Sequence, residues 1–228
     1  MVYMPVAWSS KYSSDNFPSN YDEWTVEDKI NLFEDQVLGW QLGIANDIIN
    51  VNADENRHAG FAVLSILVSY FERIGKYIDG YTQTNRSEHY FNHGLVDVFP
   101  ELEGATWVKK ILYSDVRCGM YHEAVIGGQI ILTRQFNQPI AIVNQTKPYI
   151  AIDPHTLTTA LIEHFKNYIH KLRSANENEP LLYNFIRRFD SKKNTKEIQL
   201  EYDSVNDPLI SLLIVTYIYQ LQCFLKSR

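Results

Sequence analysis

An arginine and a histidine lie five positions apart in the segment 115–124, which reads DVRCGMYHEA. Arg117 carries a permanent charge and a fork of N–H donors that matches the oxygens of a phosphate group. His122 has the side chain that can both accept and donate a proton near neutral pH. Such a pair could cleave a phosphodiester without a metal ion, because histidine would move protons while arginine stabilises negative charge.

The spacing of this pair restricts how it could act. Positions five apart lie about 140° from each other around a regular helix, so Arg117 and His122 would not share a face. The segment must therefore bend, end at Gly119, where glycine suits an irregularity, or rely on the long arginine side chain. Alternatively, a symmetric dimer could bring two pairs into one cleft. A purely structural interpretation stays open, with Arg117 bonded to Asp115 or Glu123 and a buried histidine bonded to backbone.

Three neighbouring side chains could add to this chemistry. Cys118 comes four positions before His122, so a helix would bring the histidine close enough to activate a nucleophilic thiol. Lys109 and Lys110 precede Arg117 and could bind the RNA backbone, although paired lysines often belong to a solvated helix face. We therefore treat Cys118 as an auxiliary residue and the two lysines as candidate RNA-binding residues.

Metal and nucleotide sites are poorly supported by the sequence. His89 and His93 have the four-residue spacing of two ligands on one helix face, but no acidic ligand is well placed beside them except Glu88, so a pair of solvated loop histidines is the preferred interpretation. Glu55 and His58 form the E-x-x-H pairing of di-iron bundles, which requires a second copy that the chain lacks. Glycine-rich nucleotide motifs and the G-x-S-x-G elbow are missing. We expect no metal ion and no cofactor.

Composition indicates a folded globular protein. The chain has 228 residues, of which 45% are hydrophobic and 13% aromatic, enough for one sizeable core. Its formal net charge of -6 gives no general attraction for nucleic acid, so any RNA contact would be a local basic patch. The two cysteines, Cys118 and Cys223, suit a reducing compartment, and no signal peptide is apparent. We expect a cytoplasmic protein.

Hydrophobic periodicity predicts a mainly helical domain over residues 25–228, after an irregular lead-in over 1–24. Thr25 is expected to cap a first long helix, and Gly80 to end a second one. A short polar turn between them favours an antiparallel hairpin. Further helices are expected at about 87–91, from 105 to Gly127–Gly128, from Pro154 to 174, and at 181–189.

Two segments depart from this helical pattern. Three short β-branched runs within 129–153 predict a small antiparallel sheet of two or three strands, packed on the helices. Residues 208–225 contain no charged residue and raise the question of a membrane span. Polar residues interrupt this run, so an apolar helix over about 207–226, inside a bundle or a dimer interface, is the preferred interpretation. We expect no membrane association.

The segment RCGMYH, residues 117–122, placed on such a bundle, resembles the HEPN superfamily (higher eukaryotes and prokaryotes nucleotide-binding domains). Members are helical, commonly dimeric, and often carry an arginine followed after four to six residues by a histidine. The helix pair from Thr25 to Gly80 also looks like the leading hairpin of that family. The resemblance covers about residues 25–175 and implies a HEPN-like helical bundle with a small antiparallel β insertion.

In active members, the resemblance implies metal-independent cleavage of RNA by the ribose 2′-hydroxyl, with His122 as general base or acid and Arg117 stabilising the transition state. Glu72 on the second long helix would orient them. The chain departs from the family at Cys118, where a polar residue is common, and in its β insertion and acidic balance. The expected function is an endoribonuclease of toxin or host-defence type. The alternative is a non-catalytic dimeric module that binds a protein partner.

Overall fold

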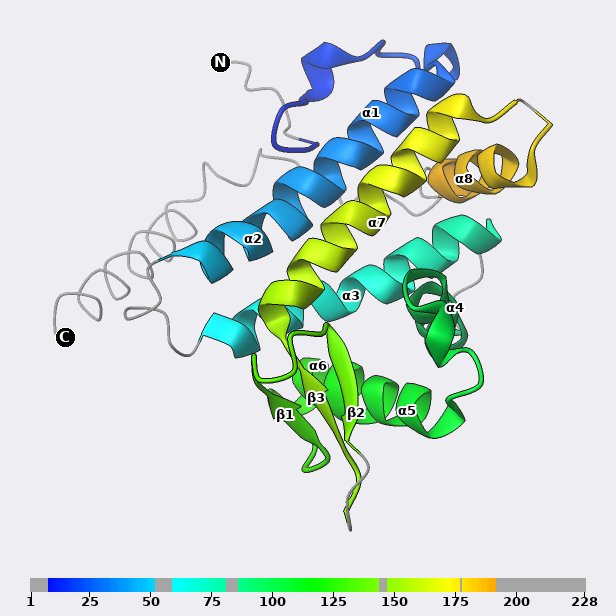
Figure 1. Cartoon of the computed structure of the whole chain (residues 1–228). Coiled ribbons are helices and arrows are strands. Elements are labelled where there is room, and N and C mark those ends of the chain that lie inside the picture. The colour runs from blue at the N-terminus through cyan, green and yellow to red at the C-terminus, as the bar shows by residue number, and fades with distance from the viewer. Residues whose placement is uncertain (1–7, 52–58, 81–85, 144–146, 177, 192–228) are drawn as a thin grey trace, which may run out of the picture. The chain divides into compact units, whose positions relative to one another are not determined.

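The computed structural model describes residues 8–51, 59–80, 86–143, 147–176 and 178–191 (Figure 1). The chain divides into two compact units, Met1–Phe189 and Asp190–Arg228, and the architecture below is that of the first. It is mainly helical with one three-stranded sheet, as predicted. Its elements in chain order are η1 (Ser14–Asn16), η2 (Tyr21–Glu23), α1 (Val26–Val37), η3 (Leu38–Leu42), α2 (Gly43–Asn50), α3 (Ala59–Asp79), α4 (Ser87–Val98), η4 (Pro100–Leu102), α5 (Thr106–Ile111), η5 (Leu112–Cys118), α6 (Gly119–Glu123), β1 (Ile130–Leu132), β2 (Ile140–Val143), β3 (Tyr149–Ile152), α7 (Pro154–Ser174) and α8 (Pro180–Ser191).

The first predicted long helix is confirmed and consists of α1, a π-helical turn η3, and α2. It pairs antiparallel with α3, as expected. In α1, the Phe33 ring lies 4.0 Å from the ring of Tyr77 near the end of α3. Further along, the Gln41 amide donates to the Ser69 hydroxyl at 2.7 Å. Gly80 ends α3 with a φ of 65°, a left-handed conformation that favours glycine.

Thr25 caps α1 as predicted. Its hydroxyl accepts a hydrogen bond from the Asp28 N–H at 3.1 Å, and the Asp28 carboxylate accepts one from the Thr25 N–H at 2.8 Å. This reciprocal pair satisfies two backbone donors that a helix start leaves open. We expect Thr25→Ala to lower the free energy of unfolding by about 1 kcal/mol in urea denaturation, whereas Thr25→Ser should stay near wild type.

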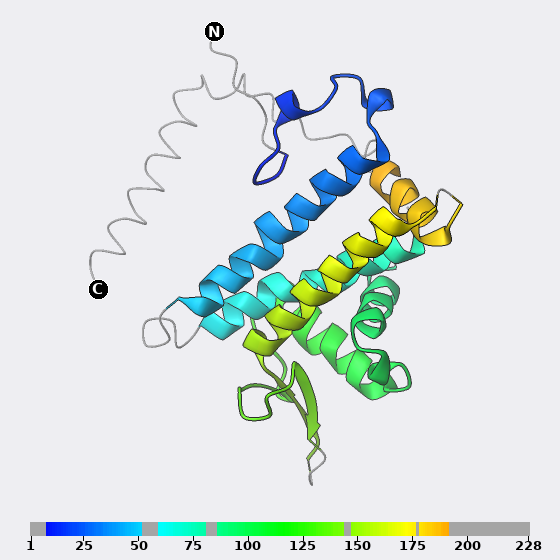
Figure 2. The same cartoon turned by 45° about the horizontal axis from the view of Figure 1, so that its top comes forward.

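Helix α7 runs beside α1 and α2 in both views and crosses α3 (Figures 1 and 2). The centre of this packing is Phe33, which has no exposed surface. Its ring lies 5.4 Å from that of Phe165 on α7 and 5.6 Å from that of Phe185 on α8. One aromatic side chain thus joins helices from the beginning and the end of the described fold.

Helix α4 is longer than the short helix predicted at 87–91. It crosses α3 at two glycines, where the backbones touch: a Cβ on Gly75 would lie 2.1 Å from the Tyr90 carbonyl oxygen, and one on Gly94 would lie 2.0 Å from the Phe71 carbonyl oxygen. Glycine is intrinsically poor inside a helix, which is why the local pattern understated α4. The close tertiary contact stabilises the helix instead.

The sheet is mixed, so the prediction of an antiparallel β insertion is wrong for one of its two pairings. Strand β3 lies between the others, antiparallel to β2 but parallel to β1. Three of its four residues, Ile150, Ala151 and Ile152, are buried, as expected of a central strand. The sheet packs on helices as predicted, because Ile140 and Ile152 share an apolar pocket with residues of α3, α4, η5 and α7.

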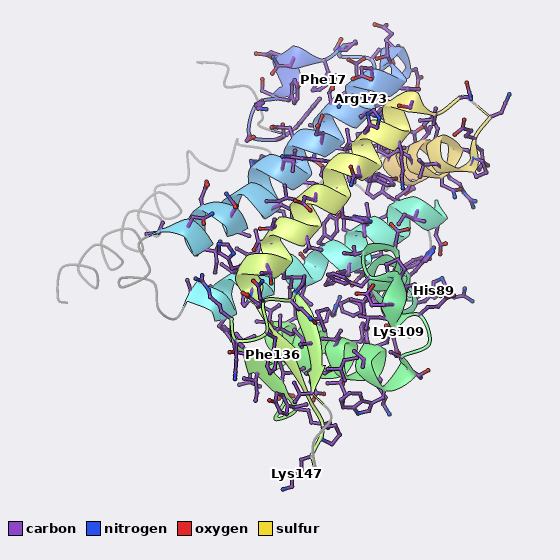
Figure 3. All side chains as sticks on the ribbon, viewed as in Figure 1. Phe17, His89, Lys109, Phe136, Lys147 and Arg173 are labelled. Carbon is purple, nitrogen blue, oxygen red and sulfur yellow. The ribbon has the colours of Figure 1, made fainter. Side chains whose placement is uncertain are left out.

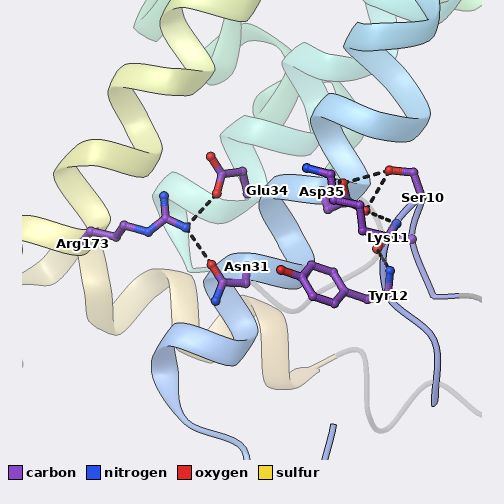
Figure 4. A network of polar contacts seen from close by, with 8 residues as sticks. Ser10, Lys11, Tyr12, Asn31, Glu34, Asp35 and Arg173 are labelled. Atoms are coloured by element: carbon purple, nitrogen blue, oxygen red, sulfur yellow. Dashed lines mark hydrogen bonds and ion pairs between the residues drawn. The ribbon is translucent and has the colours of Figure 1, made fainter. Parts of the chain in front are cut away.

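The described part of the N-terminal lead-in, residues 8–24, has little regular structure but packs against α1. The buried Asp35 carboxylate accepts hydrogen bonds from the Ser10 hydroxyl at 2.8 Å and the Lys11 N–H at 2.7 Å (Figure 4). Burial alone would raise the pKa of Asp35, but hydrogen bonds from Ser9, Lys11 and Ser10 outweigh it and lower the pKa. On the other side of α1, Arg173 of α7 bonds Glu34 at 2.7 Å.

A hydrogen-bonded chain of three side chains ties α3, α4 and α7 together. The Tyr70 hydroxyl lies 2.7 Å from His164 Nδ1, and His164 Nε2 lies 2.8 Å from the Asp97 carboxylate. Burial raises the pKa of Tyr70 well above its usual value, so the hydroxyl stays protonated. It therefore acts as the hydrogen-bond donor to His164 Nδ1. The hydrogen bond from His164 is the main cause that lowers the pKa of Asp97.

This chain predicts a pH dependence of stability. Because the pKa of Asp97 is lower in the folded state, its contribution is present above the unfolded pKa of about 3.9 and is lost as pH falls through the folded pKa. We expect the difference in urea midpoint between wild type and Asp97→Asn to shrink from pH 7 to about pH 3. Glu101→Gln, which alters an exposed carboxylate, should show no such change. An Asp97 effect that is equal at both pH values would contradict this assignment.

Several predicted features fall outside the described residues. These are the apolar helix at 207–226, Cys223, and the Glu55–His58 pair. Within the described ranges, no helix combines the length and apolar character that crossing a membrane would need.

Candidate functional site

The candidate segment lies on a helical stretch that runs through α5, η5 and α6 without interruption. Its irregularity is not at Gly119, which keeps helical angles of φ −57° and ψ −45°, but just before it, in the π-helical η5. The stretch ends at Ala124 with a left-handed φ of 54°, earlier than the predicted end at Gly127–Gly128. Arg117 thus lies on a π-helix, a rare conformation that is frequent at functional sites.

After Ala124 the chain folds back along this stretch. The Val125 N–H donates to the Gly119 carbonyl at 3.3 Å, and the Gly127 N–H donates to the Asp115 carbonyl at 3.1 Å. A Cβ on Gly119 would lie 2.7 Å from the Val125 carbonyl oxygen, and one on Gly127 would lie 2.1 Å from the Asp115 carboxylate. The two glycines therefore permit the return that holds the segment in place.

Arg117 is held by Glu72 of α3. Arg117 Nη2 donates to Glu72 Oε2 at 2.7 Å, and the other carboxylate oxygen accepts from Lys76 Nζ and from the Ser87 hydroxyl. The structure thus brings together two residues selected from the sequence, and Arg117 bonds neither Asp115 nor Glu123. Because two cations share one carboxylate, the cluster keeps a net positive charge.

Electrostatics keeps this cluster ionised. Burial would raise the pKa of Glu72, but hydrogen bonds from Lys76 and Arg117 more than offset it and lower the pKa below its usual value. Burial would likewise lower the pKa of Arg117, yet Glu72 raises it. Arg117 is therefore a fixed cation, and its side chain retains 21% exposure through which an anion could approach.

Two tyrosines flank the Arg117 guanidinium. Its carbon lies 5.2 Å from the ring centroid of Tyr121 and 5.9 Å from that of Tyr113. The three residues are four positions apart, a spacing that places side chains on one helix face. The sequence analysis missed both tyrosines, although this spacing around Arg117 is visible in the sequence.

His122 lies in the last turn of α6 and is exposed, so the interpretation as a buried, backbone-bonded histidine is wrong. Across the described ranges, no hydrogen bond or ion pair involves its imidazole, including any to Arg117. His122 directly follows Tyr121, and successive side chains on a helix point about 100° apart. The His122 side chain therefore lies on a different face from Tyr121, which covers Arg117. Within one chain, Arg117 and His122 are therefore close in sequence but lie on different faces.

The auxiliary candidates have other contacts. Cys118 is partly buried and close enough to Tyr113 that, after burial, it helps to raise the pKa of that phenol. Lys109 Nζ donates to the Glu103 carbonyl at 2.6 Å, and Lys110 is exposed. The structure shows no bond from any of the three to Arg117 or His122. Lys109 lies on α5, before the segment that carries Arg117 (Figure 3).

The histidine pair of α4 faces a carboxylate. His89 Nε2 and His93 Nδ1 each lie 3.0 Å from one oxygen of Asp79, and His89 points away from the bundle (Figure 3). The pair lies on a helix, so the solvated-loop interpretation is wrong. In the part of the chain that the structure describes, no group of three or more His, Cys, Asp and Glu side chains is arranged to hold a metal ion.

Compared with protein-family models, with curated proteins and with solved structures, the chain gave no match in any of the three comparisons. No relative supplies a function, so only the residues of the site itself indicate one. These are a fixed arginine, an exposed histidine five positions after it in the chain, and an exposed tyrosine between the two.

Proposed function

We propose that this protein is a HEPN-like, metal-independent endoribonuclease of toxin or host-defence type that acts in the cytoplasm through Arg117 and His122. One observation carries the proposal. Glu72 fixes the Arg117 guanidinium at 2.7 Å, while His122 nearby is exposed and has no bonding partner among the described residues. An oriented cation and an available proton carrier are what cleavage by the 2′-hydroxyl requires.

The reaction would proceed by internal transfer. His122 accepts the proton of the ribose 2′-hydroxyl, whose oxygen attacks the adjacent phosphorus, while Arg117 stabilises the negative charge on the phosphate oxygens. The 5′-oxygen leaves and takes up a proton from the imidazolium that His122 has become, which gives a 2′,3′-cyclic phosphate and a 5′-hydroxyl and restores the neutral histidine. Glu72 acts as a positioning residue, since it contacts Arg117 and not the reacting atoms.

A direct test incubates the purified protein with RNA, with and without a chelator, and repeats the assay with Arg117→Ala and His122→Ala. The proposal predicts cleavage that a chelator leaves unchanged and that each substitution removes. Cleavage that needs a metal ion, or that persists in both variants, would show that another site is responsible.

The different faces of Arg117 and His122 favour a symmetric dimer in which the histidine of one copy serves the arginine of the other. A mixing experiment tests this arrangement. Equal amounts of Arg117→Ala and His122→Ala protein, unfolded and refolded together, should recover about a quarter of wild-type activity, since half of the dimers would carry one intact site of two. If each copy used its own pair, the mixture would stay inactive.

The second candidate is a non-catalytic dimeric module for a protein partner. One observation favours it: Glu72 already bonds Arg117, so the guanidinium has a protein counter-ion without any RNA. This function predicts a protein that leaves RNA intact and in which Glu72→Gln weakens partner binding or self-association, as measured by analytical ultracentrifugation.

A further inference from the structure

Tyr121 combines exposure with a fixed position beside the candidate site. It is 53% exposed, although its ring lies over the Arg117 guanidinium at 5.2 Å. Its hydroxyl reaches the Ser65 carbonyl of α3 at 3.5 Å. The ring is therefore held at one face and at its tip, and the exposed surface belongs to the remainder of the ring.

The other tyrosine beside Arg117 is differently placed. Tyr113 is partly buried, and its ring lies 5.5 Å from that of Phe91. Its ring surface is already used within the fold. Only Tyr121 of the two presents a free aromatic surface next to the cation.

We propose that Tyr121 stacks on an unpaired base adjacent to the phosphate held by Arg117. This inference rests on the proposed function of the site. An aromatic ring beside a cation is the usual means of binding a single strand, because the cation takes the phosphate while the ring takes the face of a base. A base inside a duplex has both faces covered by its neighbours and could not use Tyr121.

The position of Tyr121 in the chain supports this assignment. It lies on α6, four positions after Arg117 of η5, and its ring covers the Arg117 guanidinium at 5.2 Å, so a base on its ring belongs to a nucleotide next to the phosphate that Arg117 would hold. The inference therefore makes Tyr121 a specificity-determining residue, which selects unpaired RNA, and leaves proton transfer to His122.

The test measures base stacking separately from cleavage. The probe is a short oligonucleotide with 2′-deoxy linkages, which cannot be cut by internal attack, and with 2-aminopurine, whose fluorescence falls when the base stacks on an aromatic ring. We expect the wild type to quench the single-stranded probe but not the same probe in a duplex. Tyr121→Ala should bind about 5- to 150-fold more weakly and lose the quenching, whereas Tyr121→Phe should retain both.

Tyr183→Ala is the matched control, because Tyr183 is 60% exposed on α8 and the variant should behave as wild type. Equal quenching by wild type and Tyr121→Ala, or equal use of single strand and duplex, would overturn the inference even if RNA is cleaved. Quenching that depends on Tyr121 without any RNA cleavage would instead support the inference and reject the ribonuclease. Failure to bind the probe would overturn the inference, and intact RNA in the same experiment would reject the ribonuclease as well.

Discussion

Replacing Arg117 with alanine should lower the single-turnover rate of RNA cleavage by about 10²- to 10³-fold, the usual cost of removing a donor that stabilises developing negative charge. His122→Ala should lower it by about 10²- to 10⁴-fold, as expected for a general acid or base. Rates would be measured with a labelled single-stranded RNA at saturating protein, so that binding does not limit the result.

The controls separate chemistry from charge and from folding. Arg187→Ala removes an exposed arginine from α8 and should leave the rate unchanged. Glu72→Gln keeps the shape of the side chain that holds Arg117 but removes its charge. A positioning role predicts a lower rate at saturation with little change in the apparent RNA affinity. If Arg187→Ala lowered the rate as much as Arg117→Ala, the effect would reflect general charge and not this site.

Phe33→Ala should have the largest effect on stability, lowering the free energy of unfolding by about 3–5 kcal/mol. Phe33 is fully buried, and its ring contacts Tyr77, Phe165 and Phe185 on three other helices, so the cavity could not collapse without moving several elements. The measurement is urea denaturation followed by circular dichroism.

Two further variants make this stability prediction specific. Phe33→Leu, which fills much of the same volume, should lose clearly less than Phe33→Ala. Tyr183→Ala, at an exposed position, should stay within about 0.5 kcal/mol of wild type. A loss below about 1 kcal/mol for Phe33→Ala would mean that Phe33 does not join the four helices as described.

Much of the helical framework could be predicted because its boundaries depend on local chemistry. Thr25 caps α1, Gly80 ends α3, and α7 starts at Pro154 and ends at Ser174, all as the sequence indicated. Caps, left-handed glycines and N-terminal prolines act within a few residues of themselves. The antiparallel pairing of the first two long helices followed from the short connection between them.

Features that depend on distant contacts could not be predicted in the same way. The strand order of the sheet is set by which strand is buried between the others, and a short apolar run does not show this. Helix α4 was underestimated because Gly94 looks unfavourable until its contact with Phe71 is known. The π-helical η5 also leaves no clear local pattern, yet it carries Arg117.

For the candidate site, residue types were easier to predict than their arrangement. Arg117 and His122 stood out by chemistry, and Glu72 was selected by the family resemblance before the structure placed it against Arg117. The exposure of His122 and the cover of Tyr121 over the guanidinium depend on how the segment turns after η5. The catalytic roles of all these residues stay predictions.

The ends of the RNA fragments give the most direct test of catalysis by Arg117 and His122. Wild-type protein would be incubated with a defined single-stranded RNA in a chelator, and the fragment ends identified by mass spectrometry. The account predicts 2′,3′-cyclic phosphate and 5′-hydroxyl ends that are missing with Arg117→Ala and His122→Ala. Fragments with 5′-phosphate and 3′-hydroxyl ends, or intact RNA with wild-type protein, would contradict it.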